Sequence, residues 1–325
     1  MPVLSSKTAK TAGLLGRRLV FVTGKGGVGK STVSAALALL GAQRGRRTLA
    51  CELDAKGDLG ALFETSPLAF TPRQVFPGLW GMAMDTEESL DEYLRLQLRL
   101  PGFARMGSLA KAFDFVATAA PGVREILTVG KLAYEVRERH YDLVVADASA
   151  TGQMVGQLTA PQAINSLVRV GAIRSQTDWV VDILADHAVT GLVAVTTPEE
   201  MPVRETIDLV AKVTDETDVD VAAVVVNRVL PELFSRHDEE VFERLREPAM
   251  AARLSDAAGG DVEPVFDAAR LAVTLRRARA AHLDLLRESI HPSIPLLYVP
   301  ELFTRGSGLR TTGQVAEALS AELGY

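Results

Sequence analysis

Short apolar runs and longer segments of mixed polarity alternate along the chain. Each run is apolar on both faces of a would-be strand, which is typical of strands covered by helices on both sides of a parallel sheet. The predicted strands comprise residues 20–22, 46–54, 79–85, 141–146, 190–197, 219–226 and 296–299. The pattern therefore predicts an α/β fold with a mostly parallel central sheet flanked by helices.

The segments between these runs predict helices of unequal length. The predicted helical segments are 31–40, 54–63 after a short loop, 89–100, 106–117, 122–138, 160–187, 198–213, 231–290 with a break at 256–260, and 312–323. The block at 88–138 is longer than an ordinary crossover, so we expect an inserted helical subdomain there that resumes at 153–188. Its apolar faces either pack on one another or form a partner site. An extra helical segment at 232–290 carries the mixed charges of a solvated face, and residues 1–325 are interpreted as one domain.

The first apolar run ends in a glycine-rich loop, LVFVTGKGGVGKST at 19–32. This sequence fits G-x-x-x-x-G-K-[ST] between a predicted strand and a predicted helix, the context of a phosphate-binding loop. Its glycines let backbone N–H groups turn toward a polyphosphate, and the helix N-terminus adds partial positive charge. Lys30 is expected to reach the β- and γ-phosphates, and Ser31 to bind Mg²⁺. The expected nucleotide-binding residues of the loop are Gly24, Gly26, Gly27, Val28, Gly29, Lys30, Ser31 and Thr32.

Two acids follow buried strands downstream of this loop. Asp54 comes at the carboxyl end of the second strand, where open α/β sheets place their ligands, and is expected to order the nucleophilic water or the metal's water shell. The alternative is that Asp54 is a helix N-cap. Asp147 ends the run YDLVVA, the pattern that holds Mg²⁺ in phosphate-loop enzymes. Gly152, in the segment that follows it, would allow the backbone close to the γ-phosphate.

A nucleotide base is expected at the ends of two later strands. The strand at 219–226 ends at Asn227 and Arg228, and an Asn there can present its amide to a purine edge. A guanine signature of the form [NT]-K-x-D is missing at that strand end, which favours adenine and hence ATP and ADP. The loop at 300–308 follows the last strand and is expected to cover the base with Pro300, Leu302 and Phe303.

Composition narrows the class of partners. The chain of 325 residues is 47% hydrophobic with a net charge of −6, which argues against nonspecific nucleic-acid binding because the basic footprint is missing. Its single cysteine, Cys51, excludes an internal disulfide and a thiolate metal site within one protomer. Residues 1–16 lack a long apolar core, so we expect neither a signal peptide nor a membrane span there. A cytoplasmic protein is expected.

Taken together, these motifs resemble the deviant Walker-A branch of phosphate-loop ATPases, in which a second lysine follows the first glycine, here Lys25. Within that branch the chain is similar to the arsenite-pump/tail-anchored-protein-targeting ATPase family. It also resembles actinobacterial members of that family that are often labelled anion-transporting ATPases. The motifs that carry the resemblance are GKGGVGKST, DAKGDL at 54–59 against the family's DPAHxL, APGVREILTVGK at 120–131, DASATGQ at 147–153 against DTAPTGH, TPEEMPVRET at 197–206 and VVVNRV at 224–229. They extend through most of the chain.

The resemblance implies a slow, dimeric ATPase switch that couples Mg²⁺-ATP hydrolysis to the helical subdomain and to a protein client. Lys25 would reach across the dimer interface to the partner's nucleotide and stabilise charge on the transferring phosphate, since it has no obvious role within one protomer. Lys30 would act with it, Asp54 would position the attacking water, and Asp147 would act on the metal's shell. Asn227 would contact adenine.

Several departures from the family pattern leave alternatives open. Ala55, Ala150 and Gln153 replace the family's Pro, Pro and His, so the coupling of hydrolysis to the subdomain is expected to differ. The chain would then be a homodimer, or a weakly hydrolysing subunit of a heterodimer with a related ATPase. A ParA/MinD-type positioning ATPase is a further alternative, but residues 315–325 contain no Lys or Arg for stable membrane binding. A zinc clasp, a thiol-based metalloid site and a tandem phosphate loop are all missing from the sequence.

Overall fold

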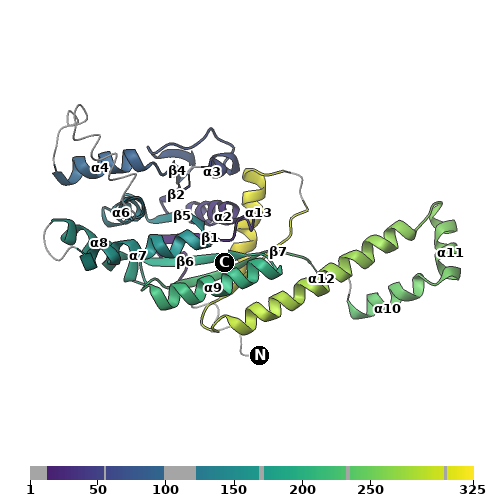
Figure 1. Ribbon diagram of the computed structural model, residues 1–325. Coiled ribbons are helices and arrows are strands. Elements are labelled where there is room, and N and C mark those ends of the chain that lie inside the picture. The colour runs from purple at the N-terminus through teal and green to yellow at the C-terminus, as the bar shows by residue number, and fades with distance from the viewer. Residues whose placement is uncertain (1–12, 55, 99–121, 168–171, 232–234, 304–305) are drawn as a thin grey trace.

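The central element is one eight-stranded sheet with the strand order β3-β4-β2-β5-β1-β6-β7-β8 (Figure 1). The computed structural model describes residues 13–54, 56–98, 122–167, 172–231, 235–303 and 306–325. Every strand pair is parallel except β3 with β4, so the predicted mostly parallel α/β fold is confirmed. The strands are β1 (Leu19–Gly24), β2 (Thr48–Glu52), β3 (Arg73–Phe76), β4 (Leu79–Ala83), β5 (Leu143–Ala150), β6 (Thr190–Thr196), β7 (Val221–Val229) and β8 (Leu296–Pro300).

Helices cover both faces of this sheet. One layer contains α2 (Lys30–Gln43), α3 (Asp58–Leu62) and α13 (Leu309–Glu322), and the other contains α6 (Val123–Arg137), α7 (Thr151–Leu167), α8 (Ala172–Ala185) and α9 (Glu200–Glu216). The central strand contributes to both layers, because Leu19 and Phe21 pack on one side and Val20 and Val22 on the other. A strand buried on both faces needs a continuous apolar run, which is the pattern that the sequence shows.

The parallel arrangement brings the carboxyl ends of β1, β2, β5 and β7 to the same edge of the sheet. In the register of the strands, Val22 of β1 and Glu52 of β2 both lie opposite Asp147 of β5. Residues that leave these strands from their carboxyl ends therefore meet, as expected for open α/β sheets.

Helices α4 (Thr86–Leu98), α6, α7 and α8 contact one another at one end of the molecule (Figure 1). The single helical stretch predicted at 160–187 is wrong, since α7 begins already at Thr151 and α8 is a separate helix. Apolar residues recur throughout that stretch, so the sequence pattern does not reveal the boundary between the two helices. The predicted helix at 106–117 lies outside the described residues, and the bounds of the inserted subdomain stay a prediction.

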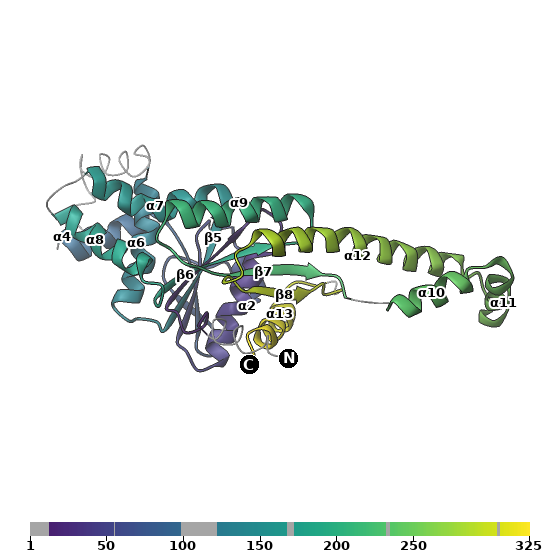
Figure 2. The same cartoon turned by 90° about the horizontal axis from the view of Figure 1, so that it is seen from below.

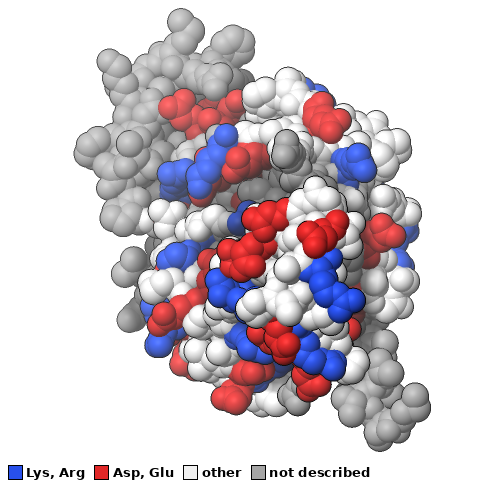
Figure 3. All heavy atoms as spheres, turned by 90° about the vertical axis from the view of Figure 1, so that its right-hand side faces the viewer, with Lys and Arg blue, Asp and Glu red and all other residues white. Residues whose placement is uncertain are grey.

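Three helices of the 232–290 segment form an extension that we call the helical arm, namely α10 (Arg236–Leu245), α11 (Pro248–Ala258) and α12 (Glu263–Ser289). Figure 2 shows the arm projecting away from the sheet, with α12 beside α9 at its base. Phe242 and Phe266 join α10 to α12 through an edge-to-face contact, with ring centroids 5.5 Å apart. Seen from the arm's side, positive and negative side chains intermingle (Figure 3), as the mixed charge pattern predicts.

Strand β3 has no counterpart among the predicted strands. It is short, lies at the edge of the sheet and carries the exposed Arg73 and Gln74, so it lacks the apolar run that marks the other strands. Edge strands commonly carry polar residues, because only one side pairs with the sheet.

Among the described helices, none combines the length and apolar character needed to cross a membrane.

The packing of α13 against α2 predicts a stability difference between two leucines. Leu319 of α13 is fully buried in the core beneath α2, so Leu319→Ala should destabilise the protein by about 2–5 kcal/mol. Leu275 on the arm is 44% exposed, and Leu275→Ala should change stability by no more than about 0.5 kcal/mol. The midpoint of urea unfolding measures both, and equal shifts would contradict the assigned core.

Cys51 offers a second test of the core. The thiol lies inside β2 with no exposed surface, and burial raises the pKa of Cys51 well above its ordinary value. Because the thiolate is the reactive species, a thiol reagent should modify the native protein only slowly and label one site per chain in denaturant. Rapid labelling of the native protein would show that β2 is not buried as described.

Candidate active site

The glycine-rich loop connects the end of β1 to the start of α2, as the sequence predicts. Gly29 adopts a left-handed conformation with φ of 93°, and a Cβ there would collide with the amide of Asn227. A Cβ at Gly24 would collide with the carbonyl oxygen of Val195 on β6. These two glycines are required because neighbouring strands approach the loop closely.

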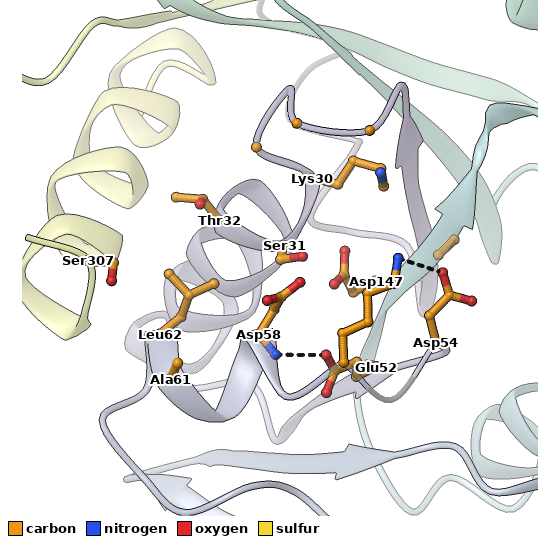
Figure 4. Close-up of a pocket in the computed structure, with 15 residues that line it drawn as sticks. Lys30, Ser31, Thr32, Glu52, Asp54, Asp58, Ala61, Leu62, Asp147 and Ser307 are labelled. Carbon is orange, nitrogen blue, oxygen red and sulfur yellow. Dashed lines mark hydrogen bonds and ion pairs between the residues drawn. The ribbon is translucent and has the colours of Figure 1, made fainter.

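The loop borders a cavity of about 350 Å³ at the carboxyl edge of the sheet (Figure 4). Strand ends, α3 and the loop before α13 complete its wall. The residues that line it are Gly26, Gly27, Gly29, Lys30, Ser31, Thr32, Glu52, Asp54, Lys56, Asp58, Ala61, Leu62, Asp147, Ala148 and Ser307. The structure thus brings most of the predicted loop residues together with both predicted acids.

Lys30 provides a partly buried positive charge at the first turn of α2. Its Nζ donates to the carbonyl oxygen of Lys25 at 3.2 Å. Burial lowers the pKa of Lys30 from its ordinary value, and the nearby Asp147 carboxylate opposes that shift. Together with the backbone N–H groups at the N-terminus of α2, this ammonium makes the loop side of the cavity suitable for an anion such as a polyphosphate.

Asp147 is a buried carboxylate on the opposite side of the cavity. The hydroxyl of Ser34 donates to its Oδ1 at 3.0 Å. Burial raises the pKa of Asp147 to about 6, while hydrogen bonds with Ser31 and Ser34 oppose the rise. A neighbouring acid, Glu52, also has its pKa raised by burial.

These acids fit a magnesium ion better than a metal that needs a closed protein cage. Oε1 of Glu52 accepts from the backbone N–H of Asp58 at 2.9 Å, but Oε2 is buried without a hydrogen-bond partner among the described atoms. Within the described part of the chain, no group of three or more His, Cys, Asp or Glu side chains is placed to hold a metal. Mg²⁺ typically takes one or two protein oxygens and completes its shell with water and substrate phosphates, so the donors Ser31 and Asp147 fit it.

Asp54 stands directly beyond the end of β2 and is held in one orientation. The Ser149 hydroxyl donates to its Oδ1 at 2.7 Å, and Lys56 lies 3.2 Å from its Oδ2. Burial favours a higher pKa, but the hydrogen bonds from Ser149 and Lys56 outweigh it, so the pKa of Asp54 lies below its ordinary value. The N-cap of α3 is Gly57, so Asp54 does not serve as the N-cap that was the alternative interpretation.

Lys25 has an ionic partner within its own chain. Its Nζ forms an ion pair and hydrogen bond with Oε1 of Glu205 on α9. The expectation that Lys25 has no obvious role within one protomer did not include this ion pair, and the action of Lys25 across a dimer interface stays a prediction. Lys25 is not among the described residues that line the cavity, so its side chain belongs to the α9 side of the loop.

The residues predicted to hold the base lie outside the cavity lining. Asn227 donates through Nδ2 to the Val28 carbonyl at 2.8 Å and accepts from the Arg228 N–H at 2.9 Å, so it fastens β7 to the phosphate loop. Gly152, which was expected near the γ-phosphate, lies in the first turn of α7, because β5 continues to residue 150. Among the loop residues expected to cover a base, Pro300 ends β8, Leu302 packs on the core and Phe303 is 75% exposed.

Seven lining residues were missing from the predicted site, namely Glu52, Lys56, Asp58, Ala61, Leu62, Ala148 and Ser307. Glu52 was missed because it lies within the predicted apolar strand, in the sequence CELD. Asp58 belongs to the DAKGDL motif at 54–59 but was not singled out as a site residue. In Figure 4 the Asp58 side chain points into the space beside Ser31. Ser307 comes from the loop that is expected to cover the base, and the role of that loop stays a prediction.

Comparison with known proteins identifies the family of this site. A sequence model of the family described as anion-transporting ATPase matches residues 17–179 and 170–252. The chain is 30% identical to ATPase BagA of Mycobacterium tuberculosis, over 95% of this chain and 94% of that protein.

More distant similarity extends to two further ATPases. The chain is 27% identical to a putative arsenical pump-driving ATPase of Halobacterium salinarum, over 83% of this chain and 43% of that protein. It is 28% identical to ATPase GET3 of Podospora anserina, over 49% of this chain and 48% of that protein. The predicted resemblance is confirmed: the chain belongs to the anion-transporting ATPase family, whose members include arsenical-pump and GET3-type ATPases.

Proposed function

We propose that the cavity binds ATP with Mg²⁺ and that the chain slowly hydrolyses it to ADP and phosphate. The observation that carries the proposal is the convergence of Lys30 and Ser31 with Asp54 and Asp147 around one cavity at the sheet's carboxyl edge. This arrangement places cationic groups and backbone N–H groups on one side and carboxylates on the other. A polyphosphate needs the first set, and its metal and attacking water need the second.

Each side chain has a role that its environment supports. Lys30 would bind the β- and γ-phosphates, and Ser31 with Asp147 would hold Mg²⁺, which when bound neutralises charge on the phosphates. Asp54 has a lowered pKa, so it is ionised at neutral pH and can accept a hydrogen bond from the attacking water. Ser149 fixes its orientation through the 2.7 Å hydrogen bond. Asn227 would contact adenine only after giving up its present contacts, so we propose for it mainly the support of the loop.

The helices beyond Asp147 are the proposed output of hydrolysis. Strand β5 continues from Asp147 to Ala150 and passes directly into α7 at Thr151, so movement of the carboxylate can be transmitted to the helix. Helix α7 contacts α6, α8 and α9. We propose that the protein acts in the cytoplasm as a dimeric switch in which Lys25 reaches the partner's nucleotide, and that these helices rearrange a protein client.

The alternative of a weakly hydrolysing heterodimer subunit receives less support. Lys30, Ser31, Asp54 and Asp147 are all present and meet at the cavity, although Ala150 and Gln153 depart from the family pattern at the start of α7. Those two departures lie where the output would begin rather than where phosphate and metal would bind, and the third, Ala55, lies outside the described residues. We therefore place the expected difference in coupling and not in hydrolysis.

Asp54→Asn tests the proposed role in hydrolysis. The amide preserves the shape and can still accept from Ser149, but it lacks the charge that orients water, so turnover should fall by roughly 10²- to 10⁴-fold. ATP affinity should stay within a few-fold of wild type. Phosphate release and equilibrium nucleotide binding measure the two effects. The matched control Asp215→Asn, on an exposed position of α9, should change neither, and full turnover of Asp54→Asn would reject the assignment.

Lys30→Ala and Ser31→Ala separate phosphate binding from metal binding. Lys30→Ala should weaken ATP binding by roughly 10- to 100-fold both with Mg²⁺ and with EDTA, because a charge-assisted hydrogen bond is lost. Ser31→Ala should weaken it only with Mg²⁺. Fluorescence of a bound nucleotide analogue measures both, with Lys212→Ala at an exposed position of α9 as the control. Equal weakening by Ser31→Ala in EDTA would contradict its role at the metal.

A further inference from the structure

The ion pair between Lys25 and Glu205 joins the phosphate loop to α9, far away in the sequence. Each of the two side chains is about one-third exposed, with a relative accessibility of 32%. The next charged pair on α9, between Arg204 and Glu200, is a local (i, i+4) contact whose side chains are each about 60% exposed. Lys25 is therefore held by a long-range contact that differs from an ordinary pair on a helix surface.

Lys25 is restrained at its backbone as well. Its carbonyl oxygen accepts from the Nζ of Lys30 at 3.2 Å, while its side chain extends to Glu205. The two lysines of the loop thus diverge, one lining the cavity and the other facing α9. A lysine side chain is flexible and can exchange one anionic partner for another without moving the backbone.

Helix α9 is itself connected to the parts of the molecule that are proposed to move. It contacts α7, which continues from the Asp147 strand, and α12 of the helical arm. Glu199, directly before α9, lies 3.7 Å from Arg279 of α12. Any shift of α9 relative to the sheet changes the position of the Glu205 carboxylate relative to Lys25.

From this geometry we infer that Glu205 is a positioning residue, which competes with the nucleotide of a second chain for the ammonium of Lys25. The Lys25 side chain extends to Glu205 on α9, and the ion pair stabilises the ammonium in that position, so engagement of the second chain's nucleotide has to overcome this pairing. The position of α9 then sets how readily two chains associate around ATP. This inference rests on the proposed function, because it takes Lys25 to act across a dimer interface.

Glu205→Gln is the direct test, since the amide keeps the size of the side chain and removes its charge. The measurement is phosphate release with Mg²⁺-ATP as a function of protein concentration. The concentration that gives half-maximal specific turnover should fall by about two- to five-fold, the strength of a partly exposed ion pair, with maximal turnover retained. Glu200→Gln on the same helix is the matched control and should leave the curve unchanged.

A double variant shows whether Glu205 acts through Lys25. Lys25→Ala should lower maximal turnover, and Lys25→Ala with Glu205→Gln should behave like Lys25→Ala alone. An unchanged or higher half-maximal concentration in Glu205→Gln overturns the inference, and so does an additional loss in the double variant. If Glu205→Gln does not fold, as judged by its unfolding midpoint, Glu205→Ala takes its place with the same expectation.

The Lys25→Ala and Glu205→Gln variants together distinguish failure of this inference from failure of the proposed function. Wild-type turnover in Lys25→Ala, at every protein concentration, would reject a dimeric role for Lys25 and the inference with it. Reduced turnover in Lys25→Ala together with a wild-type curve for Glu205→Gln would reject only the positioning role. Turnover lost in Asp54→Asn would stand in either case as evidence for hydrolysis at the cavity.

Discussion

The buried negative charge of Asp147 is the constraint around which the edge of the sheet is arranged. A carboxylate removed from water is unfavourable unless hydrogen bonds or cations offset it. Here Ser34 and Ser31 supply hydroxyls, and Lys30 supplies a charge from the start of α2. The pKa of Asp147 still rises to about 6, so the offset is incomplete. A divalent cation would complete it, which explains why the same acid suits both the fold and the proposed chemistry.

The loop that faces Asp147 is held by the neighbouring strands β6 and β7 and by the Lys30 side chain, which donates to the Lys25 carbonyl. Gly24 lies against the Val195 carbonyl of β6, and Gly29 lies against the amide of Asn227 on β7. Asn227 also fixes the Val28 carbonyl at 2.8 Å. Neighbouring strands therefore set the shape of the loop from one side, and α2 continues it on the other. A loop held in this way can keep its backbone N–H groups in place, which is what phosphate binding without a change in the protein would require.

The sequence was sufficient for those features that depend on local patterns. The parallel strands were predictable because burial on both faces demands consecutive apolar residues, as at 19–22 of β1 and 143–146 of β5. The phosphate loop was predictable because its backbone conformation requires glycine at Gly29 and other fixed positions. Strand β3 was not, since Arg73 and Gln74 at the sheet edge carry no apolar pattern. Ser307 and Glu205 were missed for another reason, because tertiary packing of a distant segment brings Ser307 to the cavity and Glu205 to Lys25.

The ionic partner of Lys25 could not be inferred from the phosphate-loop motif alone. Its place in the loop favours action on phosphate, yet the structure puts its ammonium on Glu205 and leaves the cavity to Lys30. Paired with Glu205 of α9, the ammonium does not line the cavity of its own chain. In the proposed dimer it would act on a nucleotide held by another chain that approaches from the α9 side. The internal ion pair is then compatible with a dimeric role, provided that Lys25 can change partners.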